Sequence, residues 1–193
     1  KIYGGGGADK LLGGAGHDTI RGGADDDAVI GNDGDDMLYG DGGDDKLFGR
    51  EGEDSLFGGA GSDRMAGGSG NDSLDGGVGD DVLRGEDGND TLRGGAGRDV
   101  MYGGAGADVF EFDINDLDDM DVIRDFNPLE GDRILLTGLN SSSDYTIELV
   151  TKSHASFIAL NDGVSTTRII KVFGEGFEDL SILQDADGIF LHA

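Results

Sequence analysis

The sequence repeats itself with a period of nine residues over more than half of its length. Residues 4–111 divide into twelve consecutive blocks of nine, with no insertion or deletion. A short fixed period is the signature of a solenoid, in which each repeat is one structural unit and neighbouring units stack around a shared core. The period therefore decides the fold of this segment before any other feature is considered.

Three positions of the block hold the same type of residue throughout. The first position is always glycine: Gly4, Gly13, Gly22, Gly31, Gly40, Gly49, Gly58, Gly67, Gly76, Gly85, Gly94 and Gly103. The sixth is always aspartate: Asp9, Asp18, Asp27, Asp36, Asp45, Asp54, Asp63, Asp72, Asp81, Asp90, Asp99 and Asp108. The eighth is always apolar: Leu11, Ile20, Val29, Leu38, Leu47, Leu56, Met65, Leu74, Leu83, Leu92, Met101 and Phe110. The fourth is glycine in eleven blocks and Asp25 in the other.

Each block is interpreted as a six-residue glycine-rich turn followed by a three-residue strand. Because strand side chains alternate, the eighth position points inward while the seventh and ninth point outward. Two blocks make one flattened coil of about eighteen residues, and successive coils stack at an inter-strand spacing of about 4.8 Å. We therefore expect an all-β fold, a right-handed parallel β-roll, with six turns along each edge.

Charge and spacing together indicate cation sites. The chain has 41 Asp and Glu against 14 Lys and Arg, a net charge of −27, which fits either a solvated acidic surface or a set of hard-cation sites. Regular spacing favours the sites. Glycine at the first, second and fourth positions permits positive φ, so that carbonyl oxygens and the sixth-position carboxylate of stacked turns can converge. Such an all-oxygen site suits Ca²⁺.

Other metals fit less well. Zn²⁺ takes His or Cys ligands, and the chain has no cysteine and only His17, His154 and His192. Mg²⁺ holds its waters too strongly for a protein cage of this kind. We therefore predict that roughly ten Ca²⁺ ions are bound by the sixth-position aspartates and the backbone of the first-position glycines.

The remaining acidic residues of the repeats are not predicted to be essential ligands. Asp26, Asp35, Asp44 and Asp80 occupy the fifth position and are expected to be exposed charge. Asp25, in place of a fourth-position glycine, either adds a ligand to its site or spoils it.

A few substitutions and later residues leave alternatives open. Arg50 and Glu86 replace the second glycine, and we expect both to be tolerated because only a backbone carbonyl is needed there. Beyond the repeats, Asp121, Asp125 and Asp132 form either one more calcium site or ordinary turns at strand ends.

Three aromatic residues occupy successive ninth positions and are expected to face outward. Tyr39 and Phe57 fall on one face of the roll and Phe48 on the other. They either stack on sugar rings or pack against neighbouring side chains or another domain.

Folding of the roll is expected to depend on the metal. A chain with 39 glycines loses much backbone freedom on folding. One inward side chain per block makes a thin core, and the stacked carboxylates repel one another. We therefore expect residues 1–111 to be unfolded without Ca²⁺ and to fold when it binds.

The composition changes after residue 111, since only six of the 39 glycines lie beyond it. Runs rich in β-branched and aromatic residues predict strands at 121–126, 133–136, 145–150, 156–160 and 168–173. Residues 177–183 predict a short helix and 188–191 a strand. We divide the chain into a β-roll at 1–111 and a β-rich region at 112–193 that caps the open end of the solenoid.

Several functions are disfavoured. The sequence has no run of Lys or Arg for nucleic acid, no apolar run long enough to span a membrane, and no cysteine for disulfides. It has no H-E-x-x-H motif, nucleophile elbow or phosphate loop, so we expect no catalysis by this segment.

Lys1, Ile2 and Tyr3 match positions seven to nine of a preceding block, and we expect further repeats and another domain upstream.

The blocks, for example GGAGHDTIR and GGSGNDSLD, resemble the G-G-x-G-x-D-x-U-x nonapeptides of the repeats-in-toxin (RTX) family. The resemblance implies a calcium-binding β-roll near the C-terminus of a secreted or cell-surface bacterial protein. It also implies export by a type I secretion apparatus, with the chain threaded out unfolded and folded by external calcium.

The tail adds a second resemblance. The segments 108–112, 121–126 and 130–134 are similar to the stretch that follows the repeats in secreted metalloproteases, alginate epimerase repeat modules and large adhesins. The run Asp187-Gly-Ile-Phe-Leu191 resembles the acidic-then-apolar end of type I secretion signals, although Gly188 intervenes and two residues follow Leu191.

Three functional hypotheses follow. The first is a calcium-dependent folding module that supports secretion and stability of a larger protein. The second is a polysaccharide-binding module of a secreted enzyme or adhesin; a basic or aromatic groove would support it, while the net charge disfavours an anionic polysaccharide unless Ca²⁺ bridges. The third is a fragment that assists a protease, lipase or epimerase whose active site lies upstream.

Overall fold

The computed structural model describes residues 1–113 and 120–138 and, after them, five strands at 146–152, 155–161, 168–174, 181–184 and 189–192. The repeats form strands at nine-residue intervals: β1 (Ile2–Gly6), β2 (Lys10–Ala15), β3 (Thr19–Ala24), β4 (Ala28–Asp33), β5 (Met37–Gly42), β6 (Lys46–Glu51), β7 (Ser55–Ala60), β8 (Arg64–Ser69), β9 (Ser73–Val78), β10 (Val82–Asp87), β11 (Thr91–Ala96), β12 (Val100–Ala105) and β13 (Val109–Asp113).

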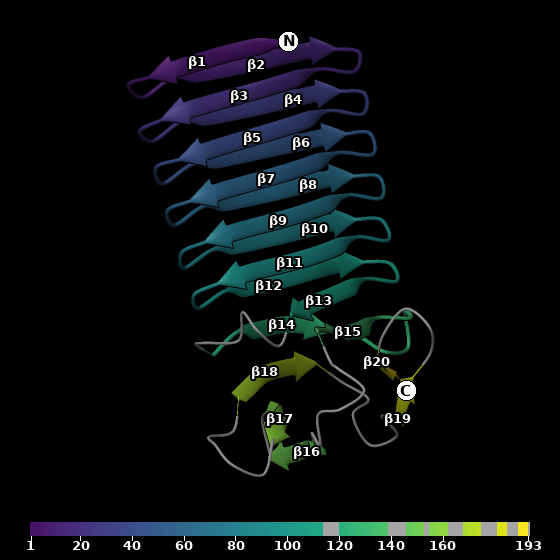
Figure 1. Ribbon diagram of the computed structural model, residues 1–193. Helices are drawn as coiled ribbons and strands as arrows, with labels where there is room; N and C mark the ends of the chain where they lie inside the picture. Colours follow the sequence, from purple (N-terminus) through teal and green to yellow (C-terminus); the bar gives the residue numbers. More distant parts are fainter. Residues whose placement is uncertain are drawn as a thin grey trace.

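The strands divide into two parallel sheets. Odd-numbered strands β1 to β13 pair in order in one sheet and even-numbered strands β2 to β12 in the other. Residues eighteen apart lie side by side, as in the pairs Leu38↔Leu56 and Leu47↔Met65. Two blocks therefore make one coil, and the coils stack from the N-terminus downward in Figure 1. The predicted parallel β-roll is confirmed.

The strands are longer than expected. From β2 to β12 each has six residues, which are positions seven to nine of one block and one to three of the next. In β7, Leu56 and Gly58 are buried while Phe57 between them is not. The inward and outward alternation thus continues through the first-position glycine. The expected three-residue strand was too short, and the turn proper spans positions four to six.

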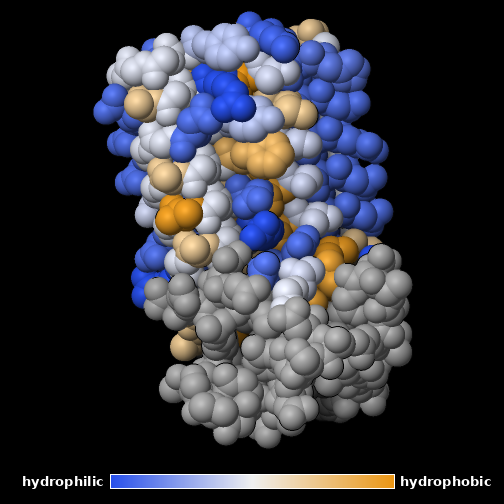
Figure 2. Space-filling view, in the orientation of Figure 1, coloured by the Kyte–Doolittle hydropathy of each residue, from blue (hydrophilic) through white to orange (hydrophobic). Residues whose placement is uncertain are grey.

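The core is a column with one side chain from each strand. Apart from partly buried Ile2 and Leu11 at the first coil, every eighth-position side chain is buried: Ile20, Val29, Leu38, Leu47, Leu56, Met65, Leu74, Leu83, Leu92, Met101 and Phe110. Hydrophilic side chains run along both edges of the face in Figure 2, where the turns stack, and the middle of that face mixes apolar with polar residues. Hydrophilic residues are therefore gathered along the edges of this face.

Coil stacking continues after the last block. Strand β14 (Val122–Phe126) pairs in parallel with β12, and β15 (Arg133–Thr137) pairs in parallel with β13. Ile134 extends the buried column, and the rings of Phe110 and Phe126 lie 6.1 Å apart between centroids. Residues without the nonapeptide spelling thus form one further coil.

Later strands complete both sheets: β18 is added in parallel to β14, and the others are added antiparallel. Strands β18 (Arg168–Gly174), β17 (Ala155–Asn161) and β16 (Thr146–Lys152) follow β14, and β20 (Ile189–His192) and β19 (Ser181–Gln184) follow β15. They lie at the end of the roll opposite the N-terminus (Figure 1). The strands expected in the tail are confirmed.

The helix expected at 177–183 is wrong in its last part. Residues 181–183 belong to β19, which pairs with β20 through Ile182↔Leu191. A helix of two turns is marginal on its own, whereas pairing with β20 supplies hydrogen bonds along the strand. Residues 177–180, and Asp187 and Gly188 of the proposed secretion signal, lie outside the described residues.

Candidate calcium sites

The sixth-position aspartates form two columns, one along each edge of the roll. The Asp45 backbone N–H donates to Oδ1 of Asp63 at 2.8 Å, and the Asp63 N–H donates in turn to Oδ1 of Asp81 at 2.8 Å. All twelve aspartates donate in this way to the aspartate one coil on, at distances of 2.7–3.0 Å. Each column is thus a continuous hydrogen-bonded ladder that joins consecutive turns.

The second carboxylate oxygen behaves differently. Among the described residues, Oδ2 is buried and has no hydrogen-bond partner in ten of these aspartates: Asp27, Asp36, Asp45, Asp54, Asp63, Asp72, Asp81, Asp90, Asp99 and Asp108. Buried polar atoms are normally paired, and an unpaired carboxylate oxygen costs free energy. A column of orphaned, buried oxygens is therefore suited to a cation.

Burial also raises the pKa of nine of these carboxyl groups, from Asp36 to Asp108 along the chain. The pKa rises from 3.8 to about 6 in Asp54, Asp63, Asp90 and Asp99, to about 7 in Asp72 and Asp108, and to about 8 in Asp81. Desolvation by burial is the main cause. The ladder hydrogen bond lowers the pKa, and neighbouring carboxylates raise it. Without a cation, the raised pKa favours protonation of these carboxyl groups at a higher pH than that of an exposed aspartate.

The orphaned oxygen lies beside the first-position glycine of the same block. A β-carbon on Gly58 would overlap Oδ2 of Asp63 and lie 2.5 Å from the carbonyl oxygen of Gly76, one coil on. A carboxylate oxygen and a backbone carbonyl oxygen thus converge on the same point, where a side chain would block them. The structure brings the predicted aspartates and glycines together, and their donor set is the hard oxygen set that Ca²⁺ prefers.

The glycine requirement differs from the expected one. Positive φ occurs at the second and fourth positions, as in Gly59 (113°) and Gly61 (130°), but not at first-position Gly58. The first glycine is needed for space and not for its conformation. Arg50 and Glu86 occupy the second position at φ 94° and 82°. Their left-handed backbone carries a cost that the sequence interpretation did not anticipate.

A second hydrogen-bonded ladder, formed by fifth-position residues, was not predicted from the sequence. The Asp44 N–H donates to Oδ1 of Asp26 at 2.9 Å, and the Ser62 N–H donates to Oδ1 of Asp44 at 2.8 Å. These aspartate side chains are exposed, as expected. Each accepts a hydrogen bond from the following coil, whereas each sixth-position aspartate accepts from the preceding coil. The Asp35 N–H donates in the same way to Nδ1 of His17 at 3.0 Å. The frequent Asp and Asn residues at the fifth position were the sequence signal for this ladder.

The aspartate columns extend beyond the repeats. Asp121 accepts from the Asp99 N–H at 2.9 Å, and Asp132 accepts from the Asp108 N–H at 3.0 Å. Asp121 and Asp132 therefore take the sixth-position role in the additional coil, although neither belongs to a nonapeptide block.

The end of one column is closed by the backbone. Oδ2 of Asp132 accepts from the Asn127 N–H at 2.7 Å, so that both oxygens of this carboxylate have partners. Asp125 accepts instead from the N–H groups of Gly103 and Gly104 at 3.0 and 3.2 Å. Within the described residues, no group of three or more acidic or histidine side chains is placed to hold a metal ion through side chains alone.

Asp25 does not disrupt the turn that it occupies. At φ 75° it adopts the fourth-position conformation, and its Oδ2 accepts a hydrogen bond from the Gly7 N–H at 3.0 Å.

Comparison with known proteins gives a family match over the repeats. The family of the RTX calcium-binding nonapeptide repeat (4 copies) matches residues 3–38, 39–74 and 75–110. No curated protein matches the sequence. No helix among the described residues has the length and apolarity to cross a membrane.

Two solved structures are similar at low identity. The extracellular lipase LipA from Serratia marcescens is 19% identical, with 81% of this chain and 39% of the lipase chain covered, and a TM-score of 0.37. The AlgE6R3 subunit of the Azotobacter vinelandii mannuronan C5-epimerase is 22% identical, with 79% of this chain and 72% of that chain covered, and a TM-score of 0.25. The chain thus matches well under half the length of the lipase.

Proposed function

Because this chain belongs to the RTX calcium-binding nonapeptide repeat family, we propose that it is a calcium-dependent folding module, unfolded when Ca²⁺ is scarce and folded when it is abundant. One observation carries the proposal. Ten buried carboxylate oxygens, arranged in two columns, have no hydrogen-bond partner in the described structure.

The ligands are contributed by stacked turns. Oδ2 of Asp63 and the carbonyl oxygen of Gly76 converge at Gly58, and the same relationship recurs from coil to coil. The sixth-position aspartates and first-position glycines therefore supply the carboxylate and backbone oxygens, and roughly ten ions fill the two columns. Bound Ca²⁺ neutralises the negative charge of the buried carboxylates.

The concentration dependence gives a switch. Calcium sites in extracellular modules bind with dissociation constants of about 10⁻⁴–10⁻³ M. Millimolar Ca²⁺ then stabilises the fold by about 1 kcal/mol per site, whereas sub-micromolar Ca²⁺ contributes almost nothing. Summed over many sites, this difference separates an unfolded chain from a folded one.

We propose that this calcium-dependent folding serves secretion. A chain that stays unfolded in a low-calcium cytoplasm can be threaded through a type I secretion apparatus and can fold outside, where Ca²⁺ is abundant. The absence of cysteine is compatible with an extracellular protein that a metal stabilises in place of disulfides. The module then supports the stability of a larger secreted protein, has a structural role and leaves any catalysis to other parts.

Limited proteolysis tests the calcium dependence. We expect rapid cleavage throughout residues 1–113 in chelator and protection of the same segment in millimolar Ca²⁺, with cleavage sites read by mass spectrometry. Equal protection in chelator and in Ca²⁺ would contradict the proposal. The polysaccharide-binding alternative is favoured by a separate feature, a groove on the outer face of one sheet.

A further inference from the structure

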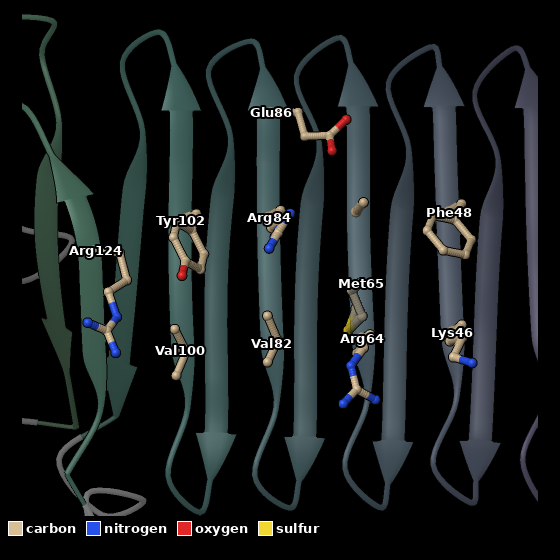
Figure 3. Close-up of a pocket in the computed structure, with 11 residues that line it drawn as sticks. Lys46, Phe48, Arg64, Met65, Val82, Arg84, Glu86, Val100, Tyr102 and Arg124 are labelled. Carbon is tan, nitrogen blue, oxygen red and sulfur yellow. The ribbon is translucent and has the colours of Figure 1, made fainter.

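An open groove runs across the outer face of the even-numbered sheet. It is lined from β6 to β14 and has a volume of about 590 Å³, within the range of about 300–1,000 Å³ that small-ligand sites occupy. Lys46, Arg64, Arg84 and Arg124 contribute four cationic groups, while Glu86 is the one carboxylate in the lining. Figure 3 shows these side chains on neighbouring strands, with Glu86 beyond Arg84 near the strand ends.

Two of the cations lie directly side by side. Lys46 and Arg64 are register partners in β6 and β8, and like charges in this arrangement repel. Among the described residues neither forms an ion pair, whereas Arg21 and Arg98 pair with aspartates at 2.7 and 3.2 Å. In a chain with 41 acidic and 14 basic residues, unpaired adjacent cations are a local conflict of the kind that marks binding sites. An anionic ligand relieves it.

The outward-facing row across the groove is Phe48, Ala66, Arg84 and Tyr102, in that order. The guanidinium of Arg84 lies 5.1 Å from the ring centroid of Tyr102. Ala66 is the register partner of both Phe48 and Arg84, so its short side chain leaves a depression between them. Phe48 and Tyr102 are half-buried and offer ring surface to a ligand.

The opposite face of the roll has no such gap at the equivalent positions. Arg21 covers the ring of Tyr39 at 4.0 Å, and Tyr39 stacks on Phe57 with 4.9 Å between centroids. There the guanidinium and the two rings form one continuous stack, with no small residue between them. The depression at Ala66 thus has no counterpart along Arg21, Tyr39 and Phe57.

The geometry of the groove limits its ligand. It lies on a sheet face, where the strand backbones already bond to one another, so a peptide gains none of the main-chain hydrogen bonds available at a sheet edge. A chain of sugar rings that carry carboxylates can stack on Phe48 and Tyr102 while arginine forks bind its carboxylates.

We propose that this groove binds an acidic polysaccharide through Lys46, Arg64 and Arg84, with Phe48 and Tyr102 as stacking surfaces. The net charge of the chain suggested that an acidic polysaccharide would need Ca²⁺ to bridge it to the protein. The cations of the groove can bind its carboxylates directly. The basic residues were not visible as a cluster in the sequence because register partners in one sheet lie eighteen residues apart. The proposal rests on the folded roll and therefore, in solution, on the calcium-dependent folding proposed above.

Isothermal titration calorimetry with a short oligogalacturonate tests the proposal at fixed free Ca²⁺, with the fold of each sample checked by circular dichroism. We expect binding that weakens with salt and is absent for a neutral maltooligosaccharide. The double substitution Lys46→Ser, Arg64→Ser should weaken binding by about tenfold or more. Arg21→Ser, an outward arginine on the other sheet, is the matched control and should leave affinity unchanged.

Three results would overturn the groove proposal: a folded protein that binds no oligogalacturonate, equal binding by the double variant, or equal binding of polyglutamate or of a single-stranded oligonucleotide. The circular dichroism spectra separate this failure from failure of the calcium proposal. A protein that is folded in chelator contradicts calcium-dependent folding but still presents the groove for titration.

Discussion

Oδ1 of Asp81 accepts a hydrogen bond from the backbone N–H of Asp63 at 2.8 Å, while Oδ2 of the same carboxylate is buried without a partner. One oxygen of each such aspartate therefore joins two coils, and the other is left for a cation. The neighbouring residue Asp80 is exposed and pairs with Arg98 at 3.2 Å. Two adjacent aspartates thus have opposite surroundings.

This contrast gives a matched pair of substitutions. Asp81→Asn should keep an acceptor for the ladder but remove the charged ligand oxygen. We expect the calcium-loaded protein to lose about 1–3 kcal/mol of unfolding free energy and to bind fewer ions in equilibrium dialysis. Asp80→Asn removes the same formal charge at the surface and should change either quantity little. Equal effects of the two substitutions would show that Asp81 is not a ligand.

Gly40 and Gly42 test the space required at the first position. A β-carbon on Gly40 would overlap Oδ2 of Asp45 and lie 2.6 Å from the Gly58 carbonyl oxygen, whereas one on Gly42 meets nothing closer than 4.0 Å. Gly40→Ala should cost about 1–3 kcal/mol and raise the calcium midpoint. Gly42→Ala, in the same strand, should stay within about 0.5 kcal/mol. Urea unfolding at saturating Ca²⁺ measures both.

The metal-free protein should respond to pH through its aspartate columns. Burial raises the pKa of Asp81 to about 8 and of Asp72 and Asp108 to about 7 in the folded state, from 3.8. The folded form therefore holds protons more tightly, and the stability that they contribute is complete below the unfolded value and is lost as pH rises through the folded values. In chelator, far-UV circular dichroism should gain β signal as the pH falls from about 8 towards 4.

Calcium binding should show the opposite dependence, because protons compete for the same oxygens. The calcium midpoint should therefore rise on acidification. A chelated protein whose spectrum is unchanged across this pH window would contradict the account of the buried carboxylates.

Arg50 tests the conformation required at the second position. Its φ of 94° is in the left-handed region, which glycine adopts without penalty. Arg50→Gly should raise the unfolding free energy by about 1 kcal/mol, measured by urea unfolding at saturating Ca²⁺. The neighbouring residue Glu51 has no positive φ, and Glu51→Gly should destabilise the protein by about 0.5–1 kcal/mol. A loss of stability in Arg50→Gly would be inconsistent with backbone strain at this position.

The repeat made most of the fold predictable. Because the period is uninterrupted, the position of each inward residue, such as Leu56, and the coil length of eighteen follow directly from the sequence. The tail strands were also predictable from their β-branched and aromatic composition. The helix at 177–183 was not, because Ile182 gains more from pairing with Leu191 than local propensity indicates.

The candidate site was predictable in its ligands but not in its extent. Asp121 and Asp132 continue the columns at separations of 22 and 24 residues, so a search with period nine misses them. The role of the first glycine depends on a close approach to a neighbouring coil that no single block reveals. The groove depends on Lys46 and Arg64 being side by side, which only the register shows.

A calcium titration followed by far-UV circular dichroism, with Mg²⁺ in parallel, tests the central claim most directly. The account predicts a largely unfolded spectrum in chelator at neutral pH and a cooperative gain of β structure at sub-millimolar to millimolar Ca²⁺, with no such gain in Mg²⁺. A full β spectrum after exhaustive chelation, or an equal response to Mg²⁺, would contradict it.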